Sequence, residues 1–436
     1  MTYTAPLADM RFALREVAGL ERIAALPGYE HATDDTVDAV LEEAAKLAGN
    51  GLAPLNRDGD KVGARLENGV VRTAPGFTGI YKEFVDGGWN SLPFDPEFGG
   101  QGMPWLLATT VQEMWQAANM GFGLVLLLNQ GAIDAIHHHG SAEQKATYLP
   151  RMISGEWTGT MNLTEPQAGS DLSVMRTRAE PAGDGSYRIS GEKIYITWGE
   201  HDLTDNIIHF VLARLPDAPP GNKGISLFLV PKFLLKPDGT PGERNDARAH
   251  SIEHKMGIHA SPTCTMVYGD NGGAVGYLVG EENRGLACMF TMMNLARLAV
   301  GLQGVGIAER ATQQAIQYAK DRKQGRSKYG AKAKSQKKTK EGFEVTAEIN
   351  AVKMSALTNA ARYSSRFAQK RAKLLAKSPN PRSCAAHRGA CVCSNGRTAT
   401  NACHTAVGDS ENARWAFHAC HNCVSATRGW GSSASA

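Results

Sequence analysis

The chain of 436 residues has little of what marks a membrane protein or a small secreted scaffold. Its longest aliphatic run, residues 121–128, ends at Asn129 and Gln130, well short of the roughly 20 apolar residues that a bilayer span needs. Residues 1–22 carry early acids and no apolar stretch of the kind a secretory signal requires. Only two cysteines occur in the first 383 residues, which excludes a disulfide framework there. We predict a folded cytoplasmic protein with no membrane span.

The last 53 residues lack Leu, Ile, Met, Lys and Tyr altogether, and therefore have almost nothing with which to build an apolar face. They hold six of the eight cysteines. Cys391, Cys393, Cys420 and Cys423, with nearby histidines, offer soft donors for zinc, but a second CxxC at the usual spacing is missing. Zinc binding, a disordered linker and an out-of-frame translation remain open. We favour the last, an aberrant, truncated or frameshifted C-terminus, and predict no metal.

Charge divides the chain into three unlike parts, with a net charge of −12 over residues 1–319, +14 over 320–383 and +2 over 384–436. Residues 320–340 alone hold ten Lys or Arg and one acid. Such a run can contact phosphates nonspecifically, but no interleaved aromatic residues or binding motif accompany it. We predict no nucleic-acid partner.

Hydrophobic periodicity predicts helices first, then strands, then helices. The spacing favours helices over 35–48, 75–87, 104–119, 121–138 and 141–153, so the N-terminal third is predicted to be all-helical. Short β-branched or aromatic runs between Gly, Pro and Asp turns fill 158–275, and a long apolar helix follows residue 285. The predicted fold class is α+β. The predicted domains are an α-helical domain at 1–157, a β-domain at 158–280, a partial helical bundle at 281–375 and an atypical tail at 376–436.

Three stretches together resemble the acyl-CoA dehydrogenase family. They are GGWNSLPFDPEFGGQGMP at 87–104, MNLTEPQAGSDLSVMRTRA at 161–179 with GEKIYIT at 191–197, and the segment 283–322 that contains NLARLAVGLQGVG. The opening residues are similar to a longer subgroup that includes 3-methylmercaptopropionyl-CoA dehydrogenases. The resemblance implies FAD as cofactor, an acyl-CoA thioester substrate, an electron-transfer flavoprotein as partner and a homo-oligomer.

The resemblance also implies which residues bind the flavin. Backbone N–H groups and small hydroxyls in LTEPQAGSD would bond its polar edge and phosphates, and glycine there permits close approach. The family's usual tryptophan before Ile-Thr is replaced by Tyr195, and Trp198 follows. The alternative is that these segments are only turn chemistry between strands. The implied cofactor-binding residues are Met161, Leu163, Thr164, Gly169, Ser170, Ile196, Thr197 and, toward a partner subunit's FAD, Arg322.

For the acyl-CoA, the resemblance implies Ser170, Asn294 and Arg297. Asn294 and Arg297 are three residues apart and therefore share one helix face. Asn294 replaces the family's more usual Asp. The alternative is that Arg297 forms an ordinary surface ion pair.

The catalytic residue stays unknown. Dehydrogenation across Cα and Cβ needs a carboxylate base, and neither family position supplies one, since nothing after residue 341 resembles the usual glutamate segment and Ala296 occupies the other position. Glu411 matches no motif. The alternative function is therefore an inactive flavin or acyl-CoA binding remnant. A rival from another class is a polyanion- or metal-binding protein acting through 320–436.

Overall fold

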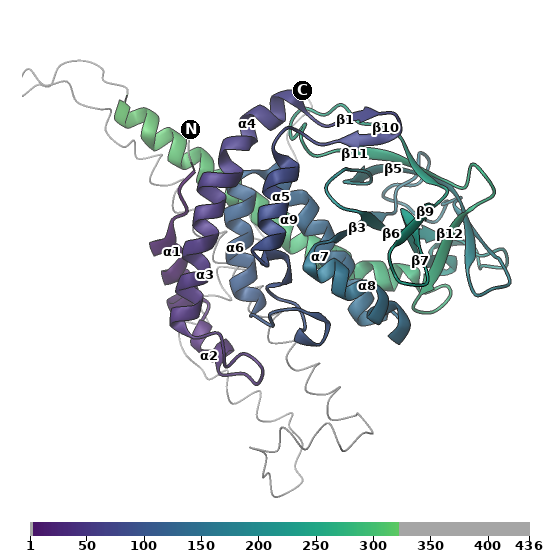
Figure 1. Cartoon of the computed structure of the whole chain (residues 1–436), viewed down its shortest axis with the longest axis horizontal. Coiled ribbons are helices and arrows are strands. Elements are labelled where there is room, and N and C mark those ends of the chain that lie inside the picture. The colour runs from purple at the N-terminus through teal and green to yellow at the C-terminus, as the bar shows by residue number, and fades with distance from the viewer. Residues whose placement is uncertain (1–2, 322–436) are drawn as a thin grey trace, which may run out of the picture. The chain divides into compact units, whose positions relative to one another are not determined.

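The computed structural model describes residues 3–321. Helices come first, a β-domain follows, and a long helix ends the described part (Figure 1). The first helices are α1 Leu7–Phe12, α2 Leu20–Ala24, α3 Asp34–Lys46, α4 Ala53–Val62, α5 Phe77–Asp86, α6 Trp105–Ala118, α7 Met120–His139 and α8 Ala142–Ser154. Single π-helical segments at Ala13–Val17 and Leu47–Leu52 extend α1 and α3. The five predicted helices are confirmed to within a few residues at either end.

Local chemistry sets where several of these helices begin. The Thr33 hydroxyl accepts the Thr36 N–H at the start of α3, and the Asn119 side chain accepts the Phe122 N–H at the start of α7. Ser141 and Gln144 form a reciprocal capping box on α8. Each cap satisfies N–H groups that have no partner within the helix, which stabilises the first turn.

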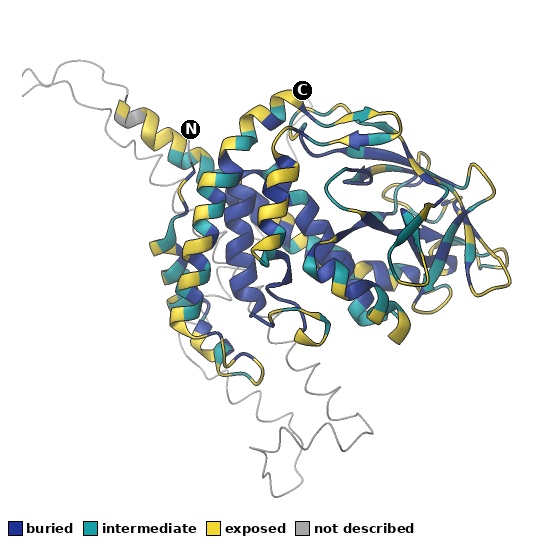
Figure 2. Cartoon of the chain, in the orientation of Figure 1, coloured by how far each residue is buried: buried dark blue, intermediate teal, exposed yellow. Residues whose placement is uncertain are grey.

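Helices α6 and α7 form the centre of the helical domain. Every residue of α6 is buried, and Figure 2 shows this helix dark blue along its length. Phe122 of α7 contacts the rings of Phe77, Tyr81 and Phe84 at centroid distances of 5.7–6.2 Å. A helix that is apolar on all sides is stable in water only when neighbours cover it all round.

The β-domain is built on one eight-stranded sheet of order β10-β11-β5-β12-β7-β6-β3, with β4 paired to β5. Its strands are β3 Trp157–Asn162, β4 Arg178–Pro181, β5 Tyr187–Thr197, β6 Asn206–Ala213, β7 Ser226–Pro231, β10 Ala247–Ile252, β11 Thr263–Tyr268 and β12 Ala274–Val279. A separate hairpin joins β8 Phe233–Leu235 to β9 Pro241–Arg244. The pairing of β3 with β6 is parallel and the other sheet pairings are antiparallel. Every residue of β6 and β7 is buried, which gives them the continuous apolar runs seen in the sequence.

The prediction that the N-terminal third is all-helical is wrong at one place. Strands β1 Arg65–Glu67 and β2 Val70–Arg72 form a hairpin. Asn68 and Gly69 have φ of 51° and 77°, the left-handed conformation of a tight hairpin turn. Val71 is buried in the apolar core of the β-domain, so tertiary packing stabilises the hairpin.

Helix α9, Gly285–Asp321, packs against α6, α7 and β7. By length and composition, α7 and α9 could each cross a membrane. In α7, however, 83% of the most apolar window is buried inside the protein, against 39% in α9. Helix α7 therefore uses its apolar surface to build the core. The α+β class is confirmed, whereas the four domain boundaries stay predictions.

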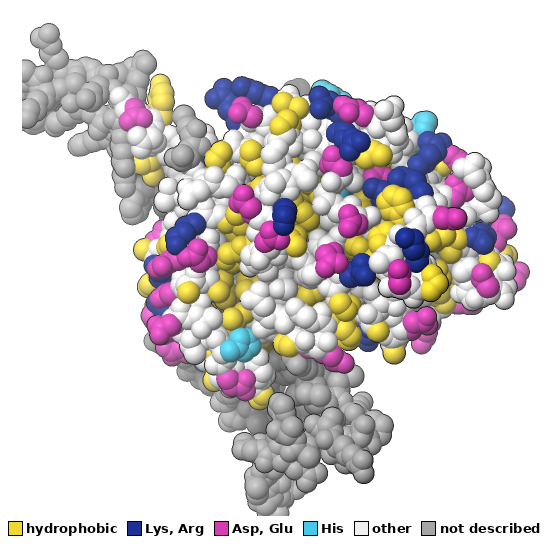
Figure 3. Space-filling view, in the orientation of Figure 1, with side chains coloured by type: hydrophobic (Ala, Val, Ile, Leu, Met, Phe, Trp, Pro, Cys, Tyr) yellow, Lys and Arg dark blue, Asp and Glu magenta, His cyan; other side chains and the backbone are white. Residues whose placement is uncertain are grey.

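Surface charge is mixed over the described residues. Acidic side chains gather beside α1 and α3, where Arg11 and Arg15 form ion pairs with Asp34, Asp38 and Glu42 (Figure 3). The structure does not describe residues 322–436, which hold most of the basic stretch 320–340 and all of the cysteine-rich tail. Their predicted properties stay predictions.

Candidate functional site

The loop LTEPQAGSD follows β3 and is tied to the end of β5. Glu165 and Ala168 exchange two backbone hydrogen bonds, of 2.8 and 3.0 Å, which close a tight turn. The Thr164 carbonyl accepts the Ile194 N–H at 2.8 Å. A Cβ on Gly169 would lie 3.7 Å from the Thr164 methyl carbon, so these two residues are neighbours. The structure thus makes the predicted residues Thr164 and Gly169 neighbours and joins Thr164 to β5 at Ile194, two residues before the predicted residue Ile196.

A buried ion pair lies beneath this loop. Lys193 Nζ donates to Glu165 Oε1 at 2.8 Å, and the two side chains are 0% and 3% exposed. Burial lowers the pKa of Lys193 to about 8, although Glu165 opposes this. Burial also acts to raise the pKa of Glu165, but Lys193, Thr177 and the Arg176 N–H outweigh it and the net pKa is lowered.

The end of β5 carries three predicted or possible flavin contacts. The Ile196 side chain is buried in the apolar core of the β-domain, so only its backbone is available to a ligand. Thr197 is half-buried. Trp198 is fully buried and stands edge-on to His201 at 5.5 Å, whereas Tyr195 is 60% exposed. Of the two aromatic residues, Tyr195 is the one whose ring is accessible to a bound group.

One face of β3, the face turned away from α7, carries a chain of hydrogen-bonded side chains that the sequence analysis missed. Thr160 Oγ1 lies 2.9 Å from His209 Nδ1 and accepts the Asn162 side-chain N–H, and Asn162 in turn accepts the Tyr268 hydroxyl at 2.8 Å. Burial lowers the pKa of His209 to about 3. The alternation of Thr158, Thr160 and Asn162 along a strand was the available signal, since residues two apart share a face.

Helix α9 places Asn294 and Arg297 together, as their spacing predicts. The Arg297 guanidinium donates to Asn294 Oδ1 at 3.0 Å and lies 5.5 Å from the centre of the Phe290 ring. Asn294 and Arg297 are exposed, and Phe290 is 43% exposed. Ala296 is half-buried beside them. The Arg322 side chain lies outside the described residues.

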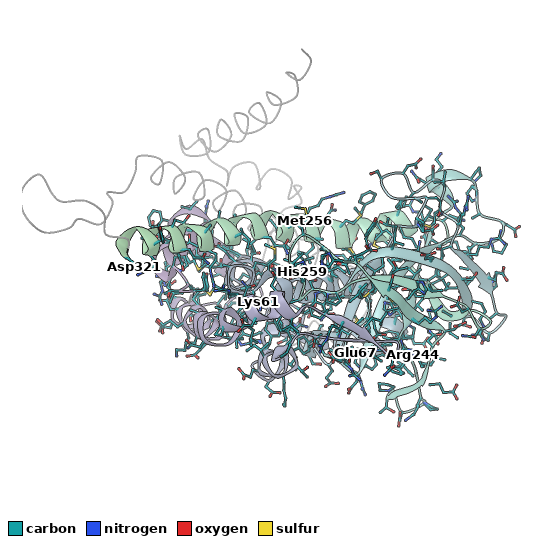
Figure 4. The ribbon with its side chains drawn as sticks, turned by 90° about the horizontal axis from the view of Figure 1, so that it is seen from above. Lys61, Glu67, Arg244, Met256, His259 and Asp321 are labelled. Atoms are coloured by element: carbon teal, nitrogen blue, oxygen red, sulfur yellow. The ribbon has the colours of Figure 1, made fainter. Side chains whose placement is uncertain are left out.

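The described residues also form a cavity of about 330 Å³ away from these segments. It lies between the end of α4 and the connection from β10 to β11, and Figure 4 labels Lys61 and His259 from its two sides. His259 is not one of the predicted site residues, and its backbone N–H donates to the Asp60 carboxylate at 2.8 Å. None of the predicted site residues lines this cavity. Within residues 3–321, no cluster of three His, Cys, Asp or Glu side chains is arranged to hold a metal ion.

Comparison with protein families agrees with this architecture. Models of the acyl-CoA dehydrogenase N-terminal, middle and C-terminal domains match residues 34–156, 160–271 and 283–386. The chain belongs to the acyl-CoA dehydrogenase family.

Individual proteins of this family that are similar to the chain include one curated relative and two solved structures. The chain is 53% identical over 326 residues to 3-methylmercaptopropionyl-CoA dehydrogenase of Ruegeria pomeroyi, which covers 75% of this chain and 55% of the relative. Among solved structures, butyryl-CoA dehydrogenase from Megasphaera elsdenii aligns with a TM-score of 0.59 and 26% identity over 78% of this chain and 85% of that chain. An acyl-CoA dehydrogenase from Bacillus anthracis complexed with FAD aligns with a TM-score of 0.62 and 22% identity over 78% of this chain and 52% of that chain. The chain spans about half the length of the curated relatives it matches.

Members of this family bind FAD, and the donors present here fit such a group. Among the described residues, the Thr164 N–H has no protein acceptor, while the carbonyls on both sides of it are hydrogen-bonded. The Thr197 hydroxyl and the exposed Gly169–Ser170 segment add small donors and an open approach. Such donors suit the carbonyl and phosphate oxygens of a flavin nucleotide.

Proposed function

We propose that this chain is an FAD-dependent acyl-CoA dehydrogenase that converts an acyl-CoA thioester to the trans-2-enoyl-CoA and passes the electrons to an electron-transfer flavoprotein. The observation that supports the proposal is the Thr164 N–H, which has no acceptor among the described residues, in a loop joined to β5 at Ile194 and next to Gly169. Bound FAD would supply the acceptor for the hydride that leaves Cβ. We further propose a cytoplasmic homo-oligomer.

The residues of this chain take separate parts in the proposal. Leu163, Thr164 and Thr197 would hold the flavin edge through backbone and hydroxyl donors, with Met161 and the Ile196 backbone beside them. Gly169 and Ser170 would lie toward the pyrophosphate and the CoA arm. Asn294 and Arg297 would bind the acyl-CoA, because an exposed guanidinium held by a neighbouring amide is suited to a polar or anionic chain.

The base that removes the Cα proton is not assigned. The positions one helical turn from Arg297 on α9 are Met293, Asn294, Val300 and Gly301, and none is acidic. A chain that binds FAD and acyl-CoA without a base would be the inactive remnant, which is the second candidate function. The two candidates differ in one observable, the reduction of bound flavin by substrate.

An absorbance titration under anaerobic conditions separates them. The purified chain would be loaded with FAD and mixed with a panel of thioesters that includes 3-methylmercaptopropionyl-CoA and butyryl-CoA. Bleaching of the oxidised flavin band by one thioester supports the dehydrogenase, and electron-transfer flavoprotein should then restore the band. Bound flavin that no thioester bleaches supports the remnant. A chain that binds no flavin contradicts both.

Two arginine variants test the acyl-CoA contact. Arg297→Ala should weaken binding of the bleaching thioester at least tenfold. Arg284→Ala is the matched control, because Arg284 is exposed just before the start of α9 and lies outside the predicted site. Equal effects of the two substitutions would contradict the assignment of Arg297.

A further inference from the structure

We propose that Lys193 is a positioning residue for the flavin, which aims the Thr164 N–H at the cofactor from beneath the loop. The inference rests on the FAD binding proposed above and deepens it. It starts from the second contact of Lys193: besides its ion pair with Glu165, Nζ donates to the Leu163 carbonyl at 3.0 Å.

The direction of the Thr164 N–H follows from peptide geometry. The Leu163 carbonyl and the Thr164 N–H belong to one trans peptide unit and point in opposite directions. Lys193 is fully buried and holds the carbonyl inward, so the N–H points away from the buried ammonium group. The next carbonyl, that of Thr164, is held by the Ile194 N–H, so the loop cannot rotate about this peptide without breaking a second hydrogen bond.

The Glu165 carboxylate fixes the base of this arrangement. It accepts the Arg176 N–H at 2.7 Å, the Thr177 N–H at 3.0 Å and the Thr177 hydroxyl, in addition to Lys193. These donors come from the segment just before β4 and from β5 itself. A buried ammonium group with a fully hydrogen-bonded counterion is held in one place, because any displacement leaves a buried charge without its partner.

A second buried lysine provides a matched control. Lys232 is 7% exposed and forms an ion pair with Glu200, which is 1% exposed. It also donates to the His201 carbonyl. It contacts none of the predicted flavin residues. Lys193→Met and Lys232→Met therefore remove the same group from two buried ion pairs, and both should lower the melting temperature.

The test compares FAD affinity in these two variants with that of the full chain, measured by quenching of flavin fluorescence, together with the visible circular dichroism of the bound flavin. We expect Lys193→Met to raise the Kd for FAD at least tenfold and to change the flavin dichroism. Lys232→Met should change the Kd less than twofold. A Kd unchanged in Lys193→Met, or raised equally in both variants, overturns the proposal.

A milder variant keeps the test decisive if Lys193→Met does not fold. Thr177→Val removes one hydroxyl donor from Glu165 and keeps the ion pair, so it should raise the Kd for FAD about threefold and lower the melting temperature less than Lys193→Met does. An unchanged Kd in folded Thr177→Val would then count against the proposal. If the unsubstituted chain binds no FAD, the proposed function fails and this inference fails with it; if it binds FAD and the variants bind equally well, only the inference fails.

Discussion

Helices α7 and α9 are alike in apolar composition but differ in how much of their surface other elements cover. Both are long and apolar, yet α7 is enclosed by α6, α8, α9 and β3, whereas Val300, Ile307 and Tyr318 of α9 are 47–59% exposed among the described residues. Gly301 and Gly304 of α9 face open space. Apolar composition alone therefore does not predict which face of a helix packs against other elements within residues 3–321.

The largest effect should come from the enclosed helix. Phe122→Ala in α7 removes a ring that is 0% exposed and contacts three other aromatic rings, so it should lower the free energy of unfolding by about 3–5 kcal/mol. Urea unfolding followed by circular dichroism at 222 nm measures this. A loss below about 1 kcal/mol would mean that α7 is not packed as described.

A second prediction concerns His209, which is hydrogen-bonded to Thr160 on the face of β3 that is turned away from α7. The pKa of His209 is lowered by burial to about 3, against 6.5 in the unfolded chain. Below pH 6.5 the unfolded state therefore binds a proton that the folded state does not. Stability should fall by about 1.4 kcal/mol per pH unit from this group as the pH drops from 6.5 toward 3.

The variant His209→Gln checks that assignment. Glutamine can retain a hydrogen bond to Thr160 and does not titrate, so its unfolding free energy should depend less steeply on pH between 6.5 and 3. Denaturant unfolding at several pH values gives the two slopes. Identical slopes in the variant and the unsubstituted chain would show that His209 is not the group responsible.

Two glycines on α9 allow its exposed face and its packed face to be compared within one helix, since Gly304 faces open space and Gly306 faces Ala117 of α6. Gly304→Ala should stabilise the chain by about 1 kcal/mol, because the site is open and alanine favours helix. Gly306→Ala should destabilise it by about 1–3 kcal/mol, because the new Cβ would lie 3.0 Å from the Ala117 backbone nitrogen. Melting temperatures of the two variants should move in opposite directions. A destabilising Gly304→Ala would reveal a partner on that face.

The smallest effect should come from the exposed face itself. Ile307→Lys should change the free energy of unfolding by less than about 0.5 kcal/mol, because Ile307 is 47% exposed in the described structure. The same urea unfolding assay used for Phe122→Ala measures it. A loss above about 2 kcal/mol would show that another part of the chain, or a second copy, buries this face.

Local patterns predicted much of the fold. Apolar spacing predicted the helices now seen as α3 and α5 to α8, and the β-branched run GEKIYIT lies in β5. The pairing of Asn294 with Arg297 also followed from spacing, because two residues three apart on a helix are always neighbours.

Other features depend on contacts between distant residues and could not be found this way. The ion pair of Glu165 with Lys193 joins a loop to a strand 28 residues away, and nothing in either local sequence specifies the partner. The sequence could not tell which of Tyr195 and Trp198 has an accessible ring, because the burial of Trp198 depends on its packing against His201. Asn68–Gly69 is a typical two-residue hairpin turn, but its strands are three residues long, too short to show an alternating pattern in the sequence.

The contact between the two ends of the described chain bears on the order of synthesis. The Thr4 backbone and the Gln313 side chain exchange two hydrogen bonds across 309 residues, and Arg310 lies over the ring of Tyr3, which is 2% exposed. During translation Tyr3 leaves the ribosome long before α9 exists, and at about 5–20 residues per second it waits for at least roughly 15 seconds. Throughout that interval the N-terminal segment is accessible to chaperones and proteases, and its final burial can report that α9 has been completed.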